Sequence, residues 1–333
     1  MLQAVFFLFT NGGFFLIYPI ILAELVVLIG AIVIDLVFGD TKGYVNPSVL
    51  AADLGAGHGK WFKKARNRVL AGFFFTMAII ILFTFPAYVL LRLISSINFL
   101  YFIASIIILK TTFSITSIRE RVNPIIDSLQ KNDIENARKH LSSIVSFNTA
   151  DMDAKNISSA TIESISRGFL DYFLTPMMFF AIFGVIGALT ARIMVSLDSA
   201  IGHRNKEYFE FGRWAAIFKT IISYIPARVS AGIIMFSSEL LNYRVQSVPL
   251  REVRVLTESV NVGWPLGSVA TCLNIRLENY GQYVLNEGGF EPSVGDIKRT
   301  MNIYYASIYI SLLIFILPIM MIVYLFAEYL VIV

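Results

Sequence analysis

Three carboxylates and one arginine in the middle of the chain have the chemistry to bind a phosphate group and a divalent cation. Glu163 and Asp171 occur in TIESISRGFLD, Asp198 occurs in SLDS, and Arg228 ends YIPAR. A carboxylate near a bilayer is costly, so its position usually marks function. Magnesium is typically held by one or two carboxylates plus substrate phosphates, and arginine binds phosphate through two parallel hydrogen bonds. The pattern therefore predicts a pocket for phosphate and magnesium.

Several acidic residues also have a structural interpretation. Asp198 could instead be the N-terminal cap of the helix that follows it. Asp35 and Asp40, in DLVFGD, are consistent with an ordinary turn where the chain leaves a membrane. Glu24 lies within an apolar run, where it faces either a helix partner or a polar cavity. The sequence leaves these alternatives open.

Other parts of the sequence argue against a phosphate-binding loop of the P-loop type and against a cysteine-based zinc site. In GAGHGK at 55–60, Leu54 stands where a phosphate loop needs glycine, and Trp61 replaces its hydroxyl residue. We interpret this stretch as a glycine-rich loop whose basic continuation contacts anionic lipid headgroups. Cys272 is the single cysteine, which excludes an intrachain disulfide and a cysteine-based zinc site.

Composition indicates an integral membrane protein. Hydrophobic residues make up 56% of the 333 residues, charged residues make up 15%, and mean hydropathy is +0.70. An average soluble domain is about 25% charged. The net charge of +4 is small and reflects cytoplasmic loops, so nucleic-acid binding is not expected. The start MLQAVFFLFTNGG lacks the basic region of a signal peptide, which predicts a retained first span.

Four segments are long and apolar enough, or nearly so, to cross a bilayer as helices. The loop after the first segment carries six positive and two negative residues, which places it in the cytoplasm. The predicted spans are 14–38, 69–92, 97–113 and 301–333, and the charges of the loop are Lys42, Lys60, Lys63, Lys64, Arg66 and Arg68 against Asp40 and Asp53.

Between the third and last spans the sequence predicts amphipathic and broken helices. Apolar residues in 114–145 recur at steps of three and four, which predicts cytoplasmic helices with one buried stripe. Gly184 and Gly187 interrupt 169–200, and we favour a re-entrant hairpin over a straight span. Pro226 divides 214–240 into a kinked or interfacial pair. We therefore expect an all-α, polytopic fold with one integral membrane domain, 1–333.

Taken in order, the motifs resemble those of the CobD/CbiB family, the adenosylcobinamide-phosphate synthases of cobalamin biosynthesis. The resemblance runs nearly end to end. Its motifs here are DLVFGD, NDIENARKHLSSIV, TIES with the following aspartate and proline, SLDSAIGHRNKEYFEFG, YIPAR, SVNVGWP at 259–265 and DIKRT at 296–300.

The resemblance implies ATP-dependent amide formation between a corrinoid carboxylate and an aminopropanol phosphate. Such an acid–amine ligase phosphorylates the carboxylate, and the amine then displaces phosphate. The reaction requires positioning and cations that neutralise phosphate charge. ATP and magnesium are the implied cofactors, and a corrinoid, an amino-alcohol phosphate and membrane lipid are the implied partners.

Matching positions supply the candidate site. The resemblance implies catalytic roles for Glu163, Asp171 and Asp198, substrate-binding roles for Arg228, Asn261 and Arg68, and metal-binding roles for Asp35 and Asp40.

The chain also departs from the family pattern at positions that bear on chemistry. The family's His-Pro appears as Asn46-Pro47, and its Arg-Asp before threonine appears as Phe147-Asn148. Its Glu-Asn is Arg167-Gly168, its Asp-Asp aligns near Lys219-Thr220, and a further asparagine is Ser223. A protonated lysine cannot ligate magnesium.

Two hypotheses follow from these departures. One is an active synthase at the cytoplasmic face of the cell membrane. The other is a catalytically degenerate relative that serves as a non-enzymatic subunit or sensor of a membrane complex. A transporter is a third interpretation, but it would be expected to show an internal repeat, and the sequence has none.

Overall fold

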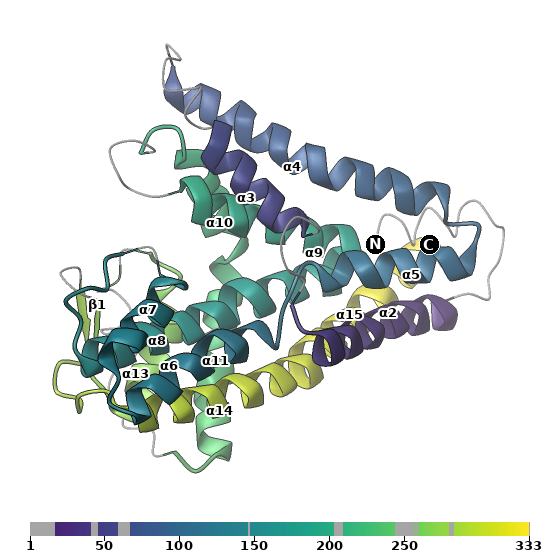
Figure 1. The fold of residues 1–333 in the computed structure, drawn as a ribbon. Helices are drawn as coiled ribbons and strands as arrows, with labels where there is room; N and C mark the ends of the chain where they lie inside the picture. The colour runs from purple at the N-terminus through teal and green to yellow at the C-terminus, as the bar shows by residue number, and fades with distance from the viewer. Residues whose placement is uncertain are drawn as a thin grey trace. The chain divides into compact units, whose positions relative to one another are not determined.

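The fold is an all-α membrane protein, as the sequence predicts, and a computed structural model describes residues 17–40, 46–58, 67–145, 147–202, 209–243, 257, 259–279 and 283–332 (Figure 1). Five basic residues of the predicted cytoplasmic loop, Lys42, Lys60, Lys63, Lys64 and Arg66, lie outside the described residues. The elements are α2 Ile17–Phe38, α3 Pro47–His58, α4 Arg68–Leu93, α5 Asn98–Lys110, α6 Ser117–Gln130, α7 Ile134–Ser142, α8 Ala154–Phe169, the π-helix η3 Leu170–Leu174, α9 Thr175–Ile201, α10 Arg213–Ile222, α11 Tyr224–Leu240, α13 Gly263–Leu273, β1 Leu277–Asn279, β2 Tyr283–Leu285, α14 Val294–Ile310, the π-helix η5 Ser311–Ile316 and α15 Leu317–Ile332.

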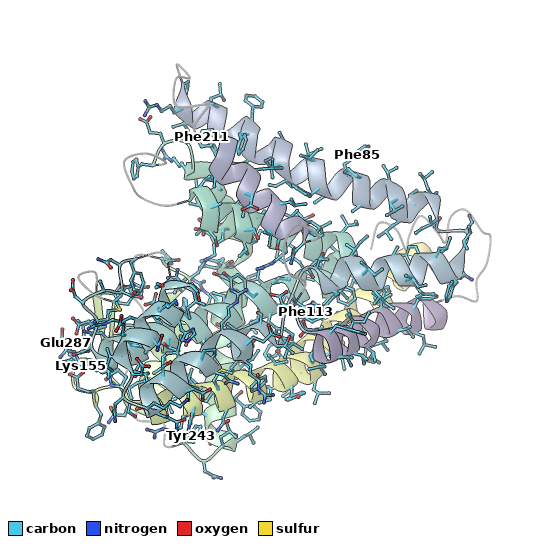
Figure 2. The ribbon with its side chains drawn as sticks, viewed as in Figure 1. Phe85, Phe113, Lys155, Phe211, Tyr243 and Glu287 are labelled. Carbon is cyan, nitrogen blue, oxygen red and sulfur yellow. The ribbon has the colours of Figure 1, made fainter. Side chains whose placement is uncertain are left out.

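Within the described residues, four helical stretches are long and apolar enough to cross a membrane, and the bent pair α10–α11 would add a fifth. Their surfaces carry exposed apolar side chains, such as Phe85 of α4, which is 59% exposed and projects outward in Figure 2. The helix α5 has 13 residues, whereas a straight span needs about 20. The four stretches are Ile21–Phe38, Arg68–Leu93, Ala154–Ile201 and Val294–Tyr324.

The chain divides into two compact units that are each discontinuous in sequence. Unit 1 contains Met1–Ser114, Thr175–Ile222 and Leu313–Val333, and unit 2 contains Ile115–Leu174 and Ser223–Leu312. Continuous helical stretches lead from one unit into the other at Leu174 and again near Leu313. This interleaving explains why the sequence shows no linker between two domains.

Unit 1 is built around α9, which packs against α3, α4, α5, α10 and α15, while α2 packs on α5 and α15. Leu189, Ile193 and Leu197 of α9 are buried in its core. At Gly72 of α4, an added Cβ would lie 2.0 Å from the carbonyl oxygen of Phe211. Glycine at this position therefore permits a close approach of backbone segments.

The helix α9 breaks at Gly184, one of the two glycines that the sequence singled out. Gly184 has φ 70° and ψ −162°, a conformation open essentially to glycine alone. In a straight helix, Phe179 and Gly187 would lie about 12 Å apart along the axis, because each residue adds about 1.5 Å. Here a Cβ added to Gly187 would lie only 2.7 Å from the carbonyl oxygen of Phe179. The helix therefore turns sharply here, and α9 is a broken helix.

Unit 2 is built around α8, which packs against α6, α7, α13 and α14 and against β1 of a small antiparallel hairpin, β1–β2, while α11 packs on α13 and α14. The predicted stripe of the amphipathic helices is buried, with Val122, Ile125 and Leu141 at 0% exposure. Asp133 accepts a hydrogen bond from the backbone N–H of Asn136 and caps α7. Polar side chains gather on the helices of this unit, among them the labelled Lys155 (Figure 2).

The break between α10 and α11 falls at Ser223, three residues before Pro226. Pro226 lies in the first turn of α11, where backbone N–H groups have no intrahelical partner. Its missing N–H therefore costs nothing there. The segment is a bent pair, as expected, and the proline lies in the first turn of the second helix.

Candidate functional site

The helix α8 places Glu163 and Arg167 one turn apart on the same face. An Nη of Arg167 lies 3.0 Å from Oε1 of Glu163. Glu163 is buried, whereas the Arg167 side chain is 49% exposed. The pair therefore joins a buried carboxylate to a guanidinium that reaches solvent.

The strand β1 supplies a second partner for Glu163. The side-chain amide of Asn279 donates to Oε2 of Glu163 at 3.2 Å. Ser159, one turn before Glu163, fixes the strand to α8: its hydroxyl donates to the Glu278 carbonyl at 3.0 Å and accepts from the Glu278 N–H at 2.8 Å. The carboxylate is thus held from two elements.

The strand β2 brings Tyr283 opposite Asn279 in the hairpin register. Its hydroxyl is buried and has no hydrogen bond of normal geometry within the described structure, although it lies near Glu163, Arg167 and Asn279. Burial, followed by the negative charge of Glu163, raises the pKa of Tyr283 above its ordinary range. Tyr283 is therefore a neutral donor at physiological pH.

Asp171 lies in the π-helix η3 that follows α8, where π-helical turns are frequent at functional sites. It is buried and interacts electrostatically with Arg167. Gly168, where the family pattern has asparagine, faces Ile118: an added Cβ would lie 2.6 Å from Cδ1 of that isoleucine. The structure thus gathers Glu163, Asp171, Arg167, Asn279 and Tyr283, which we call the α8 cluster.

Arg228 and Asn261 belong to two further parts of unit 2, α11 and the segment just before α13, where α11 packs on η3 and α13 packs on α8. The Arg228 guanidinium stands 3.3 Å from the ring centre of Tyr224 and 5.1 Å from that of Trp264. It also donates to the Tyr224 carbonyl at 2.5 Å. Stacking fixes the plane of a guanidinium while its edge can still donate to an anion. Asn261 is fully buried, and its backbone carbonyl accepts a hydrogen bond from the backbone N–H of Trp264.

The other four candidate residues belong to unit 1. Asp35 is fully buried and has Lys110 at 2.7 Å and the Ser114 hydroxyl at 3.3 Å. Arg68 faces Glu210 across 4.0 Å at the surface. Asp198 lies in the last turn of α9, and its carbonyl accepts from the Gly202 N–H at 2.8 Å, so it stands inside a helix and not at the start of one. Asp40 is half-buried just after α2.

Two of the candidate carboxylates, Asp35 and Glu163, already have a cationic side chain beside them. Within the ranges that the structure describes, no group of three or more His, Cys, Asp or Glu side chains is placed to hold a metal. The donor set suits an ion that arrives with phosphates, since magnesium commonly needs only one or two protein carboxylates.

Two residues that depart from the family pattern, Asn46 and Lys219, and one residue of its motifs, Asp296, have well-defined places in the fold. Asn46 precedes Pro47, the first residue of α3, and its side chain accepts from the Ser48 N–H at 3.0 Å, so it caps that helix. Lys219 is buried in α10. Asp296 of DIKRT forms a capping box with Ser293 and pairs with Arg299.

Sequence reasoning did not single out Lys110, Asn279 or Tyr283. Lys110 ends an apolar run, which is a signal for a buried charge that needs a partner. Asn279 and Tyr283 flank Tyr280-Gly281-Gln282 in LENYGQYVL, and a glycine between two short apolar or aromatic runs is a hairpin signal. That signal was available in the sequence.

Comparisons with known proteins identify the relatives of this chain. The CobD/Cbib protein family matches residues 28–313. The chain is 45% identical over 298 residues to "Probable cobalamin biosynthesis protein CobD" of Thermoplasma volcanium, covering 90% of this chain and 98% of that protein. The protein of the same name from Thermoplasma acidophilum is 40% identical over 89% of this chain and 97% of its own length.

A third relative, "Cobalamin biosynthesis protein CobD" of Dehalococcoides mccartyi, is 35% identical over 79% of this chain and 87% of its own length. No solved structure matches the chain.

Proposed function

Because this chain belongs to the CobD/CbiB family and so has a role in cobalamin biosynthesis, we propose that it catalyses ATP-dependent amide formation between a corrinoid carboxylate and an aminopropanol phosphate. The observation that carries the proposal is the α8 cluster. Two buried carboxylates, Glu163 and Asp171, surround one half-exposed arginine, Arg167. Opposite charges held together in this way suit a substrate that bears both an ammonium and a phosphate.

The chemistry assigned to the chain is binding, orientation and proton transfer. Magnesium–ATP would supply the phosphoryl group that activates the corrinoid carboxylate. An ammonium must lose a proton before its nitrogen attacks an acyl carbon, and a carboxylate near the amine can accept that proton. We assign this role to Glu163 or Asp171. Arg228, held flat by Tyr224 and Trp264, would neutralise a phosphate oxygen in the transition state.

We further propose that the reacting groups face the cytoplasm. The basic loop between the first two spans favours that orientation. The substrates then meet the enzyme at a lipid surface.

The decisive experiment is rescue of a strain that lacks the synthase, together with a purified assay for ATP-dependent corrinoid amidation. We expect rescue by the wild-type chain. In the purified assay E163Q and D171N should reduce the rate of amide formation, by about 100-fold or more for the carboxylate that acts as base. R276Q is the matched control, because Arg276 pairs only with surface acids, Glu278 and Glu291, among the residues described. Absence of both rescue and amide formation would exclude the enzyme.

One set of observations favours the alternative of a non-enzymatic subunit or sensor. The positions of two expected acidic groups hold cations: Arg167 is bound to Glu163, and Lys219 is buried in α10. If the chain forms no amide but co-purifies with a membrane partner whose activity it changes, that alternative replaces the synthase. Turnover by the purified chain alone would contradict it.

A further inference from the structure

We propose that Arg167 and Tyr283 form an anion subsite beside Glu163, which receives the phosphate group of a substrate. The family pattern has glutamate and asparagine where this chain has Arg167 and Gly168, so an arginine subsite is not part of that pattern. The natural ligand follows from the proposed function, but the subsite itself is argued from the geometry of the α8 cluster.

Arg167 has the donors that a phosphate requires. A guanidinium carries five N–H donors, and within the described part of the chain the hydrogen-bonded partner of Arg167 is Glu163, through one Nη atom. The side chain is 49% exposed, so the guanidinium side chain can be reached from solvent by a ligand. The bond to Glu163 also fixes its orientation, which lowers the entropy lost on binding an anion.

Tyr283 supplies a second donor. Its hydroxyl is buried in the described structure without a hydrogen bond of normal geometry, next to Arg167, Glu163 and Asn279. A buried polar group without a partner costs stability, which is explained if a ligand completes it. The phenol stays protonated because burial and Glu163 raise its pKa. It therefore donates, and an anionic oxygen is the matching acceptor.

The two carboxylates, Glu163 and Asp171, determine which other charge the ligand should carry. Glu163 is already neutralised by Arg167 and accepts from Asn279, so it repels a phosphate less than a lone carboxylate would. Asp171, also within electrostatic reach of Arg167, adds a second negative charge. A ligand with a phosphate and an ammonium close together matches both signs. The phosphate could instead belong to ATP, and the two sources are separated by experiment.

The test is calorimetric binding to the purified full chain in detergent, with three probes: inorganic phosphate, O-phosphoethanolamine and a non-hydrolysable ATP analogue with magnesium. We expect O-phosphoethanolamine to bind, and R167Q and Y283F each to weaken it by about tenfold or more, since a charge-assisted hydrogen bond is lost. R276Q should bind as the wild type does. R167K, which keeps the charge, should bind more tightly than R167Q.

Thermal unfolding of the unliganded proteins separates a ligand contact from a structural one. Within the described residues the Tyr283 hydroxyl has no hydrogen bond of normal geometry to lose, so Y283F should keep or raise the wild-type Tm while losing affinity. If the ATP analogue is weakened more than O-phosphoethanolamine, the subsite holds the nucleotide phosphate. If the wild type binds none of the probes, or if both variants bind them as the wild type does, the subsite is wrong. Binding requires no turnover, so a chain that binds but forms no amide contradicts only the proposed function.

Discussion

Asp35 and Lys110 form a buried ion pair, with their atoms 2.7 Å apart and their side chains 0% and 3% exposed. Removing one partner leaves an unpaired buried charge, which typically costs about 3–5 kcal/mol. We expect K110M to lower the free energy of unfolding in detergent by about that amount, whereas the double variant D35L/K110M recovers most of it, because no charge is then left alone.

The matched control is R68Q, which removes an exposed pair whose atoms are 4.0 Å apart and should change stability by less than about 1 kcal/mol. Equal loss in K110M and R68Q would show that the Asp35–Lys110 pair does not stabilise unit 1. The pair also bears on the sequence prediction that Asp35 binds a metal. That role requires Asp35 to exchange a lysine for an ion, so metal-dependent stability in K110M, but not in the wild type, would support it.

At the level of elements, the break in α9 depends on Gly184. Its backbone lies at φ 70°, ψ −162°, so any side chain there adds strain of about 1–3 kcal/mol. We expect G184A to lower Tm in detergent. G232A is the control, since Gly232 lies within α11 with open space around its Cα, and alanine there should stabilise the helix by up to about 1 kcal/mol. A Tm for G184A at or above that of G232A would contradict the strained break.

The start of α7 predicts a local pH dependence. Hydrogen bonds from the Asn136 side chain and backbone lower the pKa of Asp133. A carboxylate whose pKa is lower in the folded state stabilises the fold above its unfolded pKa, and this stabilisation is lost as pH falls through the folded value. Amides of α7 should therefore exchange hydrogen faster below about pH 4 than near pH 7, after correction for intrinsic rates.

The variant D133N keeps a side-chain acceptor but has no charge to titrate. It should cap α7 at every pH and lose this pH dependence. An unchanged dependence in D133N would assign it to another group.

For the whole molecule, the central prediction is its orientation in the membrane. Cys272 is 1% exposed, and burial raises the pKa of its thiol, so a maleimide should leave the wild type unlabelled. S95C, in the turn between α4 and α5, should react with a membrane-impermeant maleimide added outside intact cells. D53C on the exposed side of α3 should react only after the cells are opened. The reverse labelling pattern would place the basic loop outside.

The sequence alone determined the membrane class, the amphipathic helices, the glycine break in α9 and the family. These properties depend on composition, local periodicity and motif order, which a chain carries whether or not it is folded. It also predicted one pocket for Glu163, Asp171, Asp198 and Arg228. The structure brings Glu163 and Asp171 close together because they lie about two turns apart on one continuous helical stretch, α8 and η3.

The tertiary structure decided which charges meet. Asn279 bonds to Glu163 across 116 residues, and Lys110 reaches Asp35 from another helix. Such pairs depend on helix packing and on a hairpin anchored by Ser159, and no local pattern encodes the partner. The same packing placed Lys110 beside Asp35, for which the sequence predicts a metal-binding role, and it placed Tyr283 beside Arg167. Long-range pairing is a property of the folded core, because burial makes an unpaired charge or hydroxyl costly and so selects its partner.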